Sequence, residues 1–425
     1  MALTSMSWKP MLAGAIVGLM ALPITLNAQQ SAPGAAPAPL PAPTTNSVLM
    51  DAPKNPAAQK LAPVAPPPIA KAADQIPLSK FKVPNGFKLE VYASGMVNAR
   101  SLARGDKGTI FVSTRLLDRI YAVTDNNGKH EVKPLYSGLL RPNGIAFKNG
   151  TLYLAELNKI SKMENIEANL DNPPKPVVIY DNLPSDEPHG WKYLAIGPDN
   201  KLYFNVGAPC NICEPPPTHA QLRRINMDGS GMEVYARGIR QVVGLDFHPV
   251  SHQLYFSENQ RDWLSEDLPN DKLNRVVKPG QEDFGFPRCH QGNVPDPEFG
   301  WGKGCEGVSK PLALLGPHSA PLGIRFYTGT MFPKEFQNGL FVARHGSWNK
   351  TKKFGGDIVF VTLNANGTVK SVKPFITGFL QPDNNYIGRP VDMLQMPDGS
   401  LLISDDWNGA VYRLSYSKAQ VSQAR

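Results

Sequence analysis

Short apolar segments alternate with turns rich in Gly, Asp and Asn along most of this chain. One unit recurs six times: an apolar start, a polar turn, and a strand-like run rich in Leu, Ile, Tyr and Phe. The copies are SLARGDKGTIFVST from Ser101, NGIAFKNGTLYLAE from Asn143, LAIGPDNKLYFNVG from Leu194, VGLDFHPVSHQLYFSE from Val243, LGIRFYTGTMFPKEFQNGLFVA from Leu322 and VDMLQMPDGSLLISDD from Val391. Short strands separated by turn residues predict an all-β protein.

Most copies continue into a further strand, such as DRIYAVT, AQLRRINM, GGDIVFVTL and GAVYRLSY. A repeat of about 40–50 residues with several strands is typical of propeller blades. The pattern therefore predicts a six-bladed β-propeller over residues 78–416, with a pair of β-sandwiches as the alternative. The fourth and fifth intervals are longer than the others, and long excursions from a regular scaffold usually carry function.

The segments outside the repeats differ in composition. In residues 1–28, Lys9 precedes an apolar run that ends in Leu-Asn-Ala, which predicts a secretory signal peptide. The apolar run of about 16 residues is short for a membrane span, although an uncleaved anchor is the alternative. Residues 29–77 are rich in Ala and Pro and predict a disordered tether, and residues 417–425 form a tail. We expect a periplasmic or secreted protein without a transmembrane span after cleavage.

Four cysteines lie in the predicted propeller, and export makes disulfides the expected state. The local pairing joins Cys210 to Cys213 and Cys289 to Cys305, with crossed pairings as alternatives. A c-type haem needs CxxCH, but Glu214 follows Cys213. The 16-residue separation of the second pair also argues against a four-cysteine zinc site.

The formal net charge is +8, from 44 Lys and Arg against 36 Asp and Glu. These basic residues are scattered along the chain, whereas a nucleic-acid-binding protein concentrates them on one helix or stripe. The charge therefore excludes a nucleic-acid partner and favours a small anionic ligand or the cell envelope.

Polar residues stand just ahead of the repeats. In a propeller the loops before the inner strands meet at one end of the central channel, so these side chains should converge. They include Asn143, His189, Lys192, Arg240, Gln241, His318 and Arg389. Arginines bind carboxylates through two parallel hydrogen bonds, which predicts a planar polyanionic ligand. A histidine titrates near neutral pH, so His189 is a candidate general base, with a solvated turn histidine as the alternative.

The stretch SENQRDWLSEDLPNDKLN (residues 257–274) is rich in oxygen donors. Calcium prefers oxygen ligands, so this loop is a candidate metal site, with a solvated acidic loop as the alternative. Gly302–Gly307 matches GxGxxG, but it has no preceding strand or following helix to make a dinucleotide site. The sequence contains no P-loop, HExxH or GxSxG motif.

These segments together resemble the soluble glucose/sorbosone dehydrogenase family of PQQ-dependent sugar dehydrogenases. The resemblance covers residues 80–416 and lies in EPHGWKYLAIGPDNKLYFNVG, RGIRQVVGLDFHP, SENQRDWLSEDLPNDKLN, HSAPLGI, the HGSWN insertion and GRPVDMLQMPDG. It implies a six-bladed propeller that uses pyrroloquinoline quinone (PQQ) and calcium. CNICE, which begins at Cys210, is more similar to the sorbosone/aldose branch than to the glucose-oxidising one.

The resemblance also assigns roles to individual positions. His189 matches the general base, and Arg240 and Arg389 match arginines beside the cofactor. Gln241 and Val243 replace an asparagine and a glutamine of the family pattern. The remaining assignments are Lys350 as a PQQ contact, and main-chain oxygens of Gln260 and Arg261 as calcium ligands.

One departure concerns the group that orients the base. The glucose-oxidising branch has an acidic residue where this chain has Ala208, so Asp186 or Glu187 are the candidate substitutes. The resemblance predicts oxidation of an aldose C1 hydroxyl or a sorbosone-like aldehyde, with an external cytochrome or quinone as electron acceptor. A calcium-dependent propeller lactonase and a non-catalytic sugar- or protein-binding propeller are the alternatives.

Overall fold

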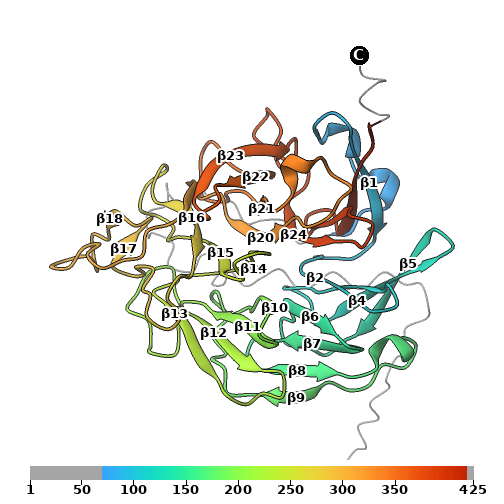
Figure 1. Cartoon of the computed structure of the whole chain (residues 1–425), viewed down its shortest axis with the longest axis horizontal. Coiled ribbons are helices and arrows are strands. Elements are labelled where there is room, and N and C mark those ends of the chain that lie inside the picture. The colour runs from blue at the N-terminus through green and yellow to red at the C-terminus, as the bar shows by residue number, and fades with distance from the viewer. Residues whose placement is uncertain (1–68, 419–425) are drawn as a thin grey trace, which may run out of the picture. The chain divides into compact units, whose positions relative to one another are not determined.

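The computed structural model describes residues 69–418. The predicted signal peptide, most of the predicted tether and the end of the tail lie outside the described residues. Within them, six four-stranded antiparallel sheets follow one another around a common centre, as Figure 1 shows. The predicted all-β six-bladed propeller is confirmed.

Each blade is built from strands that are consecutive in the sequence, except at the closure and in the fourth blade, where a two-stranded excursion intervenes. Blades 1 to 3 comprise β2 (Leu102–Arg104), β3 (Ile110–Val112), β4 (Ile120–Asn126) and β5 (Lys129–Tyr136); β6 (Gly144–Lys148), β7 (Thr151–Ala155), β8 (Ile160–Met163) and β9 (Val177–Tyr180); and β10 (Leu194–Ile196), β11 (Lys201–Val206), β12 (Gln221–Asn226) and β13 (Glu233–Arg237). Blades 4 to 6 comprise β14 (Gly244–Phe247), β15 (Leu254–Glu258), β16 (Asn270–Arg275) and β19 (Ala313–Pro317); β20 (Pro321–Phe326), β21 (Leu340–Arg344), β22 (Asp357–Leu363) and β23 (Val369–Ile376); and β24 (Pro390–Gln395), β25 (Leu401–Asp405), β26 (Ala410–Tyr416) and β1 (Phe87–Ser94).

The last blade closes the ring with a strand from the opposite end of the domain. β1 pairs antiparallel with β26, from Phe87 opposite Tyr416 to Ser94 opposite Ala410. This pairing ties the two ends of the propeller into one sheet. The repeat pattern did not predict it, because β1 lies ahead of the first copy.

Serines at the same position of three repeats join neighbouring blades. The hydroxyl of Ser113 donates to the Asn143 carbonyl at 2.6 Å, and that of Ser404 donates to the Arg100 carbonyl at 2.6 Å. Ser257 makes the equivalent bond to the carbonyl of Leu322. Each bond runs from the second strand of one blade to the start of the next, so it fixes the loops that line the channel mouth.

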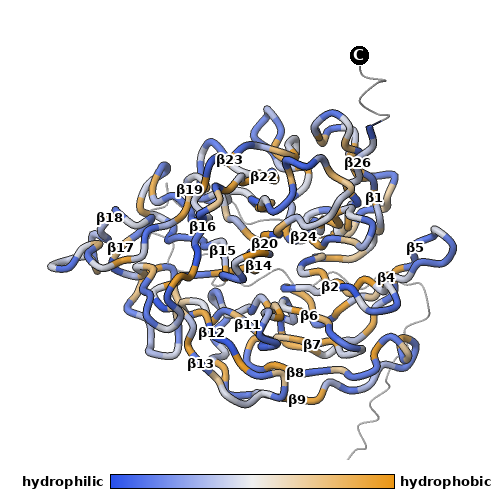
Figure 2. Tube along the Cα trace, in the orientation of Figure 1, coloured by the Kyte–Doolittle hydropathy of each residue, from blue (hydrophilic) through white to orange (hydrophobic). Residues whose placement is uncertain are grey.

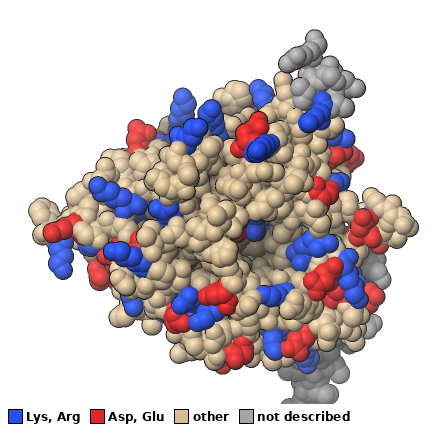
Figure 3. Space-filling model, viewed as in Figure 1, with Lys and Arg blue, Asp and Glu red and all other residues tan. Residues whose placement is uncertain are grey.

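The apolar residues of the repeats fill the space between blades. Figure 2 shows hydrophobic positions along the strands and hydrophilic ones along most outer turns. The cluster between blades 5 and 6 is strongly aromatic: Phe87 packs edge-on against Phe332 and Phe375. Basic and acidic side chains are interspersed over the face in Figure 3, which agrees with the scattered charge of the sequence.

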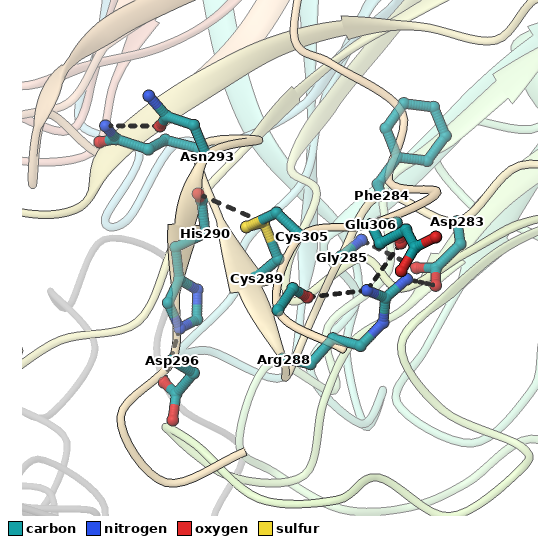
Figure 4. The surroundings of a disulfide bond; sticks show 12 residues. Asp283, Phe284, Gly285, Arg288, Cys289, His290, Asn293, Asp296, Cys305 and Glu306 are labelled. Atoms are coloured by element: carbon teal, nitrogen blue, oxygen red, sulfur yellow. Dashed lines mark hydrogen bonds and ion pairs between the residues drawn. A yellow bond between two sulfur atoms is a disulfide. The ribbon is translucent and has the colours of Figure 1, made fainter. Parts of the chain in front are cut away.

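The fourth blade carries a long excursion between β16 and β19, which contains the short pair β17 (Cys289–His290) and β18 (Val294–Pro295). The predicted disulfides are confirmed: Cys289 pairs with Cys305, and Cys210 pairs with Cys213. Figure 4 shows the first of these beside Arg288, whose guanidinium donates to the carbonyls of Gly304 and Glu306 at 2.8 and 3.0 Å. The excursion is therefore closed by a covalent bond and by side-chain bonds.

The folded domain begins earlier than the predicted residue 78. The amide of Lys71 donates to the Asn408 carbonyl at 2.9 Å, and Ile76 is buried in the aromatic cluster. Two short 3₁₀ helices, Ala73–Gln75 and Leu78–Lys80, lie in this segment. In the part of the chain that the structure describes, no helix has the length and apolar character needed to cross a membrane.

Candidate functional site

The turns that lead into the inner strands share a backbone feature. A residue with positive φ precedes the inner strand in five blades: Asn98, Arg141, His189, Gly238 and His318. A left-handed conformation at a non-glycine residue is uncommon and often marks a functional site. Because it recurs here in blade after blade, it belongs to the repeat, and the φ of 49° at His189 is not by itself a sign of catalysis.

The surroundings of His189 distinguish it from an ordinary turn histidine. Only 8% of the residue is exposed, and Nδ1 lies 2.9 Å from the carbonyl oxygen of Ala208. A carbonyl can only accept, so the neutral ring carries its proton on Nδ1 and leaves Nε2 unprotonated. Burial, followed by the positive charge of Arg240, holds the pKa of His189 well below its ordinary value. The ring is therefore a neutral imidazole at neutral pH, as a general base must be.

The group that orients the base is a main-chain carbonyl rather than a carboxylate. Asp186 instead lies 3.0 Å from Nε2 of His219, and Glu187 accepts from Arg141 at 3.1 Å. The acidic side chain missing at Ala208 is thus replaced by the carbonyl of that same residue. Sequence reasoning missed this because a main-chain acceptor leaves no mark on residue identity.

The loop closed by the Cys210–Cys213 disulfide holds a second site residue, Arg240. Its Nε donates to the Asn211 carbonyl and its Nη2 donates to Asn211 Oδ1, both at 2.8 Å. Nη2 also pairs with Asp262 Oδ2 at 3.1 Å. The Ala208 amide, in turn, donates to the Arg240 carbonyl at 2.8 Å. One short loop thus fixes both the predicted base and the predicted cofactor arginine.

Trp191 connects His189 to an arginine from the first blade. The ring centroids of His189 and Trp191 are 6.0 Å apart. With its amide oriented to satisfy both neighbours, Gln241 donates to the His189 carbonyl at 2.9 Å and accepts from Trp191 Nε1 at 3.1 Å. The guanidinium of Arg115 lies over the Trp191 ring, 4.4 Å from its centroid.

Arg389 belongs to a charged group formed by blades 1, 5 and 6. Its Nε donates to the His345 carbonyl at 3.0 Å. The carboxylate of Asp406 pairs with Arg100 Nη1 at 2.9 Å and with His345 Nε2 at 2.8 Å. Burial and the charge of Arg389 lower the pKa of His345 to about 4, so Asp406 is the ionised partner in this group.

The site carries more positive than negative charge. Arg100 and Arg240 each have one carboxylate partner, whereas Arg115 and Arg389 form no ion pair with any described residue. The sequence analysis did not identify Arg100 or Arg115 as site residues. Arg100 stands just ahead of the first repeat, and Arg115 follows the second strand of blade 1 as Asp406 follows that of blade 6. Comparing the residues just ahead of each repeat, and those just after the second strand of each blade, would have identified both arginines.

Two predicted cofactor residues, Lys192 and Asn143, are buried and bonded to groups of the protein itself. Lys192 is fully buried, and its Nζ donates to the carbonyl of Leu157 at 2.9 Å and to that of Gly190. Burial and the charge of Arg223 lower the pKa of Lys192 to about 7. Asn143 donates to the Lys192 carbonyl at 2.8 Å and accepts from Arg100 Nε at 3.1 Å. In this structure both residues are bonded to main-chain carbonyls of the His189 loop, Lys192 to Gly190 and Asn143 to Lys192.

The fifth-blade insertion packs on the loop of the fourth blade. Asn349 Nδ2 donates to Asp262 Oδ1 at 2.7 Å, and His318 Nε2 lies 2.7 Å from the Ser265 carbonyl. Lys350 Nζ donates to the Glu266 carbonyl and pairs with Asp267 at 3.1 Å. The predicted residues His318 and Lys350 therefore join these two loops.

The predicted calcium positions are buried in the same loop. The Gln260 amide donates to Asp271 Oδ1 at 2.8 Å, and Arg261 Nη1 pairs with Asp296 Oδ2 at 2.6 Å. Among residues 69–418, no three His, Cys, Asp or Glu side chains gather as a metal-binding group. A cation here would depend on main-chain and amide oxygens.

The sequence of this chain is similar to those of known proteins. The family model described as glucose/sorbosone dehydrogenase matches residues 159–413, more than half of the chain. An uncharacterised protein of Borreliella burgdorferi is 34% identical over 364 residues, which cover 82% of this chain and 94% of that protein. Quinoprotein glucose dehydrogenase B of Acinetobacter calcoaceticus is 24% identical over 333 residues, covering 64% of each chain.

Solved structures share the fold. A calcium structure of the Trichoderma reesei carbohydrate-active enzyme of family AA12 superposes with a TM-score of 0.69 and 18% identity, covering 82% of this chain and all of that one. The PQQ domain of Coprinopsis cinerea pyranose dehydrogenase, in its holo form, gives 0.65 and 20%, covering 83% and 99%. PQQ-bound aldose sugar dehydrogenase of Streptomyces coelicolor gives 0.56 and 19%, covering 79% and 100%.

Proposed function

This chain belongs to the glucose/sorbosone dehydrogenase family, and from that membership we propose that it is a PQQ-dependent sugar dehydrogenase. The proposed reaction is oxidation of an aldose C1 hydroxyl or a sorbosone-like aldehyde. PQQ, when bound, supplies the acceptor for the hydride that leaves the sugar carbon. The observation that carries the proposal is a neutral, buried His189 that shares the Trp191 ring with Arg115, an arginine without an ion pair among the described residues.

The residues at the mouth fit a planar ligand with several carboxylates. Arg389 forms no ion pair, and Arg115 Nε is buried without a hydrogen-bond partner in the described part of the chain. An unpaired buried donor is costly unless a ligand satisfies it. Arg389 and Arg115 are therefore residues that we expect to hold carboxylates, since a guanidinium donates to them in pairs. Arg240, although it is already paired with Asp262, is the third candidate because it matches the family's arginine beside the cofactor.

His189 would take the proton of the sugar hydroxyl at Nε2. Its Nδ1–H stays bonded to the Ala208 carbonyl, which keeps the ring oriented and supports the imidazolium that forms. Gln241 and Trp191 limit movement of the loop, and Trp191 offers an aromatic face beside the base. The chain's own contribution is thus to position an unprotonated nitrogen and to fix the neighbouring charges.

We also propose a calcium ion at the fourth-blade loop, held by oxygens of amides and of the main chain rather than by a carboxylate cluster. Asn349 Oδ1 is buried and has no hydrogen-bond partner among the described residues, and the same side chain is bonded to Asp262. This oxygen and the main-chain oxygens of Gln260 and Arg261 are hard donors of the kind that calcium prefers. Calcium, when bound there, would polarise the electron acceptor. We further propose export to the periplasm or medium and electron transfer to an external carrier, a cytochrome or quinone.

The test is dye-linked oxidation of a panel of aldoses and sorbosone by the purified full chain, with and without PQQ and calcium. We expect turnover that needs PQQ and falls at least about 100-fold in His189→Gln, as loss of a general base predicts. His130→Gln is the matched control, because His130 stacks on Tyr92 at the outer strand of blade 1. Absence of both PQQ binding and turnover would refute the proposal and favour the lactonase or binding-protein alternatives.

A further inference from the structure

Arg115 has surroundings that its structural role does not explain. The guanidinium lies over the Trp191 ring, yet it has no carboxylate partner in residues 69–418, and its Nε is buried there without a hydrogen bond. Part of the residue remains open to solvent. Stacking on an aromatic ring orients the planar fork but satisfies none of its N–H groups. The donors are thus oriented and left available.

Other arginines of this fold show what a purely structural arginine looks like. Arg344 also lies over an aromatic ring, that of Phe354, at 4.8 Å. Its guanidinium, however, is paired with both oxygens of Asp357 and donates to the Leu315 carbonyl at 3.0 Å. Arg115 also lies over an aromatic ring but lacks such pairing among residues 69–418, which leaves its donors open to a ligand.

The charges around Arg115 make an anionic partner favourable. Burial, and then the positive charges of Arg100, Arg141 and Arg389, lower the pKa of Arg115 to about 9, while Asp406 opposes this shift. The guanidinium is still charged at neutral pH, so its folded environment contains uncompensated repulsion. A bound anion would remove that repulsion and satisfy the free donors at the same time.

We propose that Arg115 is a carboxylate-binding residue of the active site, placed by Trp191 next to His189. The position beside the base restricts the carboxylate to two sources, an acid group of PQQ or the acid group of a sugar acid such as a uronate. Both present the same planar anion to the guanidinium. The inference rests on the proposed function for its first source, and the experiment separates the two.

The experiment measures binding to the full-length protein without turnover. PQQ is titrated by its absorbance, and glucuronate and glucose are titrated by calorimetry, in wild type, Arg115→Met and Arg115→Lys. Loss of a charge-assisted hydrogen bond predicts about a tenfold to hundredfold weaker affinity in Arg115→Met. Arg115→Lys should recover only part of it, because an ammonium cannot donate a parallel pair.

Arg141→Met is the matched control for the loss of one positive charge. Arg141 belongs to the same charged group, but it already donates to Glu187 at 3.1 Å and to the Leu116 carbonyl at 3.2 Å. We expect its affinities to change less than about threefold, as for an exposed charge. Near-ultraviolet circular dichroism checks that each variant is folded.

Each outcome decides the proposal. Weaker PQQ binding in Arg115→Met assigns the carboxylate to the cofactor, and lost discrimination of glucuronate over glucose assigns it to the substrate. A folded Arg115→Met with wild-type affinities for PQQ and glucuronate overturns the proposal while the sugar dehydrogenase function stands. Failure of wild type to bind PQQ would count against the proposed function, and the glucuronate titration alone would then decide the role of Arg115.

Discussion

We expect the two disulfides to contribute differently to stability and to PQQ affinity. Removing Cys289–Cys305 should lower stability more, whereas removing Cys210–Cys213 should lower PQQ affinity more. The perturbation is Cys210→Ala with Cys213→Ala, compared with Cys289→Ala with Cys305→Ala. Each bond restricts the unfolded chain by an amount that grows with the loop it closes. The sequence separations are 3 and 16 residues. The chain-entropy relation then gives about 2 kcal/mol for the first disulfide and about 3 kcal/mol for the second.

The effect on PQQ affinity should be larger for the loss of Cys210–Cys213 than for the loss of Cys289–Cys305. The shorter loop contains Asn211, which accepts from Arg240 twice, and it follows Ala208, which orients His189. A hydrogen bond to a charged group contributes about 1.5–3 kcal/mol when it is fixed. Partial loss of the bonds to Arg240 therefore predicts PQQ affinity about tenfold weaker in the Cys210/Cys213 variant. The Cys289–Cys305 disulfide closes the fourth-blade excursion, and its loss should leave that affinity within about threefold of wild type.

The assay combines thermal unfolding with PQQ titration of the same samples. For a domain of this size, each kcal/mol corresponds to a Tm change of about 1.4 °C. We expect Tm to fall by about 3 °C in the Cys210/Cys213 variant and by about 4 °C in the Cys289/Cys305 variant. Wild-type PQQ affinity in the Cys210/Cys213 variant would refute the reasoning, as would equal loss of affinity in both variants.

Three further expectations follow from buried ionisable groups. The folded pKa of His189 is well below its ordinary value, so kcat/KM should not fall through protonation of this histidine between pH 8 and pH 6. A fall in kcat/KM centred near pH 6.5 would contradict the buried neutral base. The folded pKa of Lys192, about 7, lies below the unfolded value of about 10.4, so the unfolded chain binds more protons between these values and stability rises with pH across them. Urea unfolding at pH 7 and 9.5 should show this rise, about 3 kcal/mol, in wild type. An equal rise in Lys192→Met would exclude Lys192 as its source. Asp392 accepts from the Leu102 amide at 3.0 Å and from the Tyr193 hydroxyl at 3.1 Å. Asp392→Ala should therefore lower the free energy of unfolding by about 2–5 kcal/mol, and Asp392→Asn should lower it less. A loss below about 1 kcal/mol in Asp392→Ala would contradict its role in joining the blades.

The sequence by itself determined the blade architecture. Strand alternation and turn chemistry are properties of a few neighbouring residues, so each copy of the repeat could be recognised without knowing its neighbours. The register of the repeat also placed His189, Arg240 and Arg389 ahead of inner strands, where the fold brings their blades to one mouth. The local cysteine pairings were equally accessible, because short separations favour closure.

The tertiary structure decided which groups meet at that mouth. The pairing of β1 with β26, the ion pair of Arg100 with Asp406, and the stacking of Arg115 on Trp191 all join residues far apart in the sequence. No local period encodes such contacts, since they depend on closure of the ring. The acceptor that orients His189 is a main-chain carbonyl, which every residue possesses, so only its position in space could reveal it.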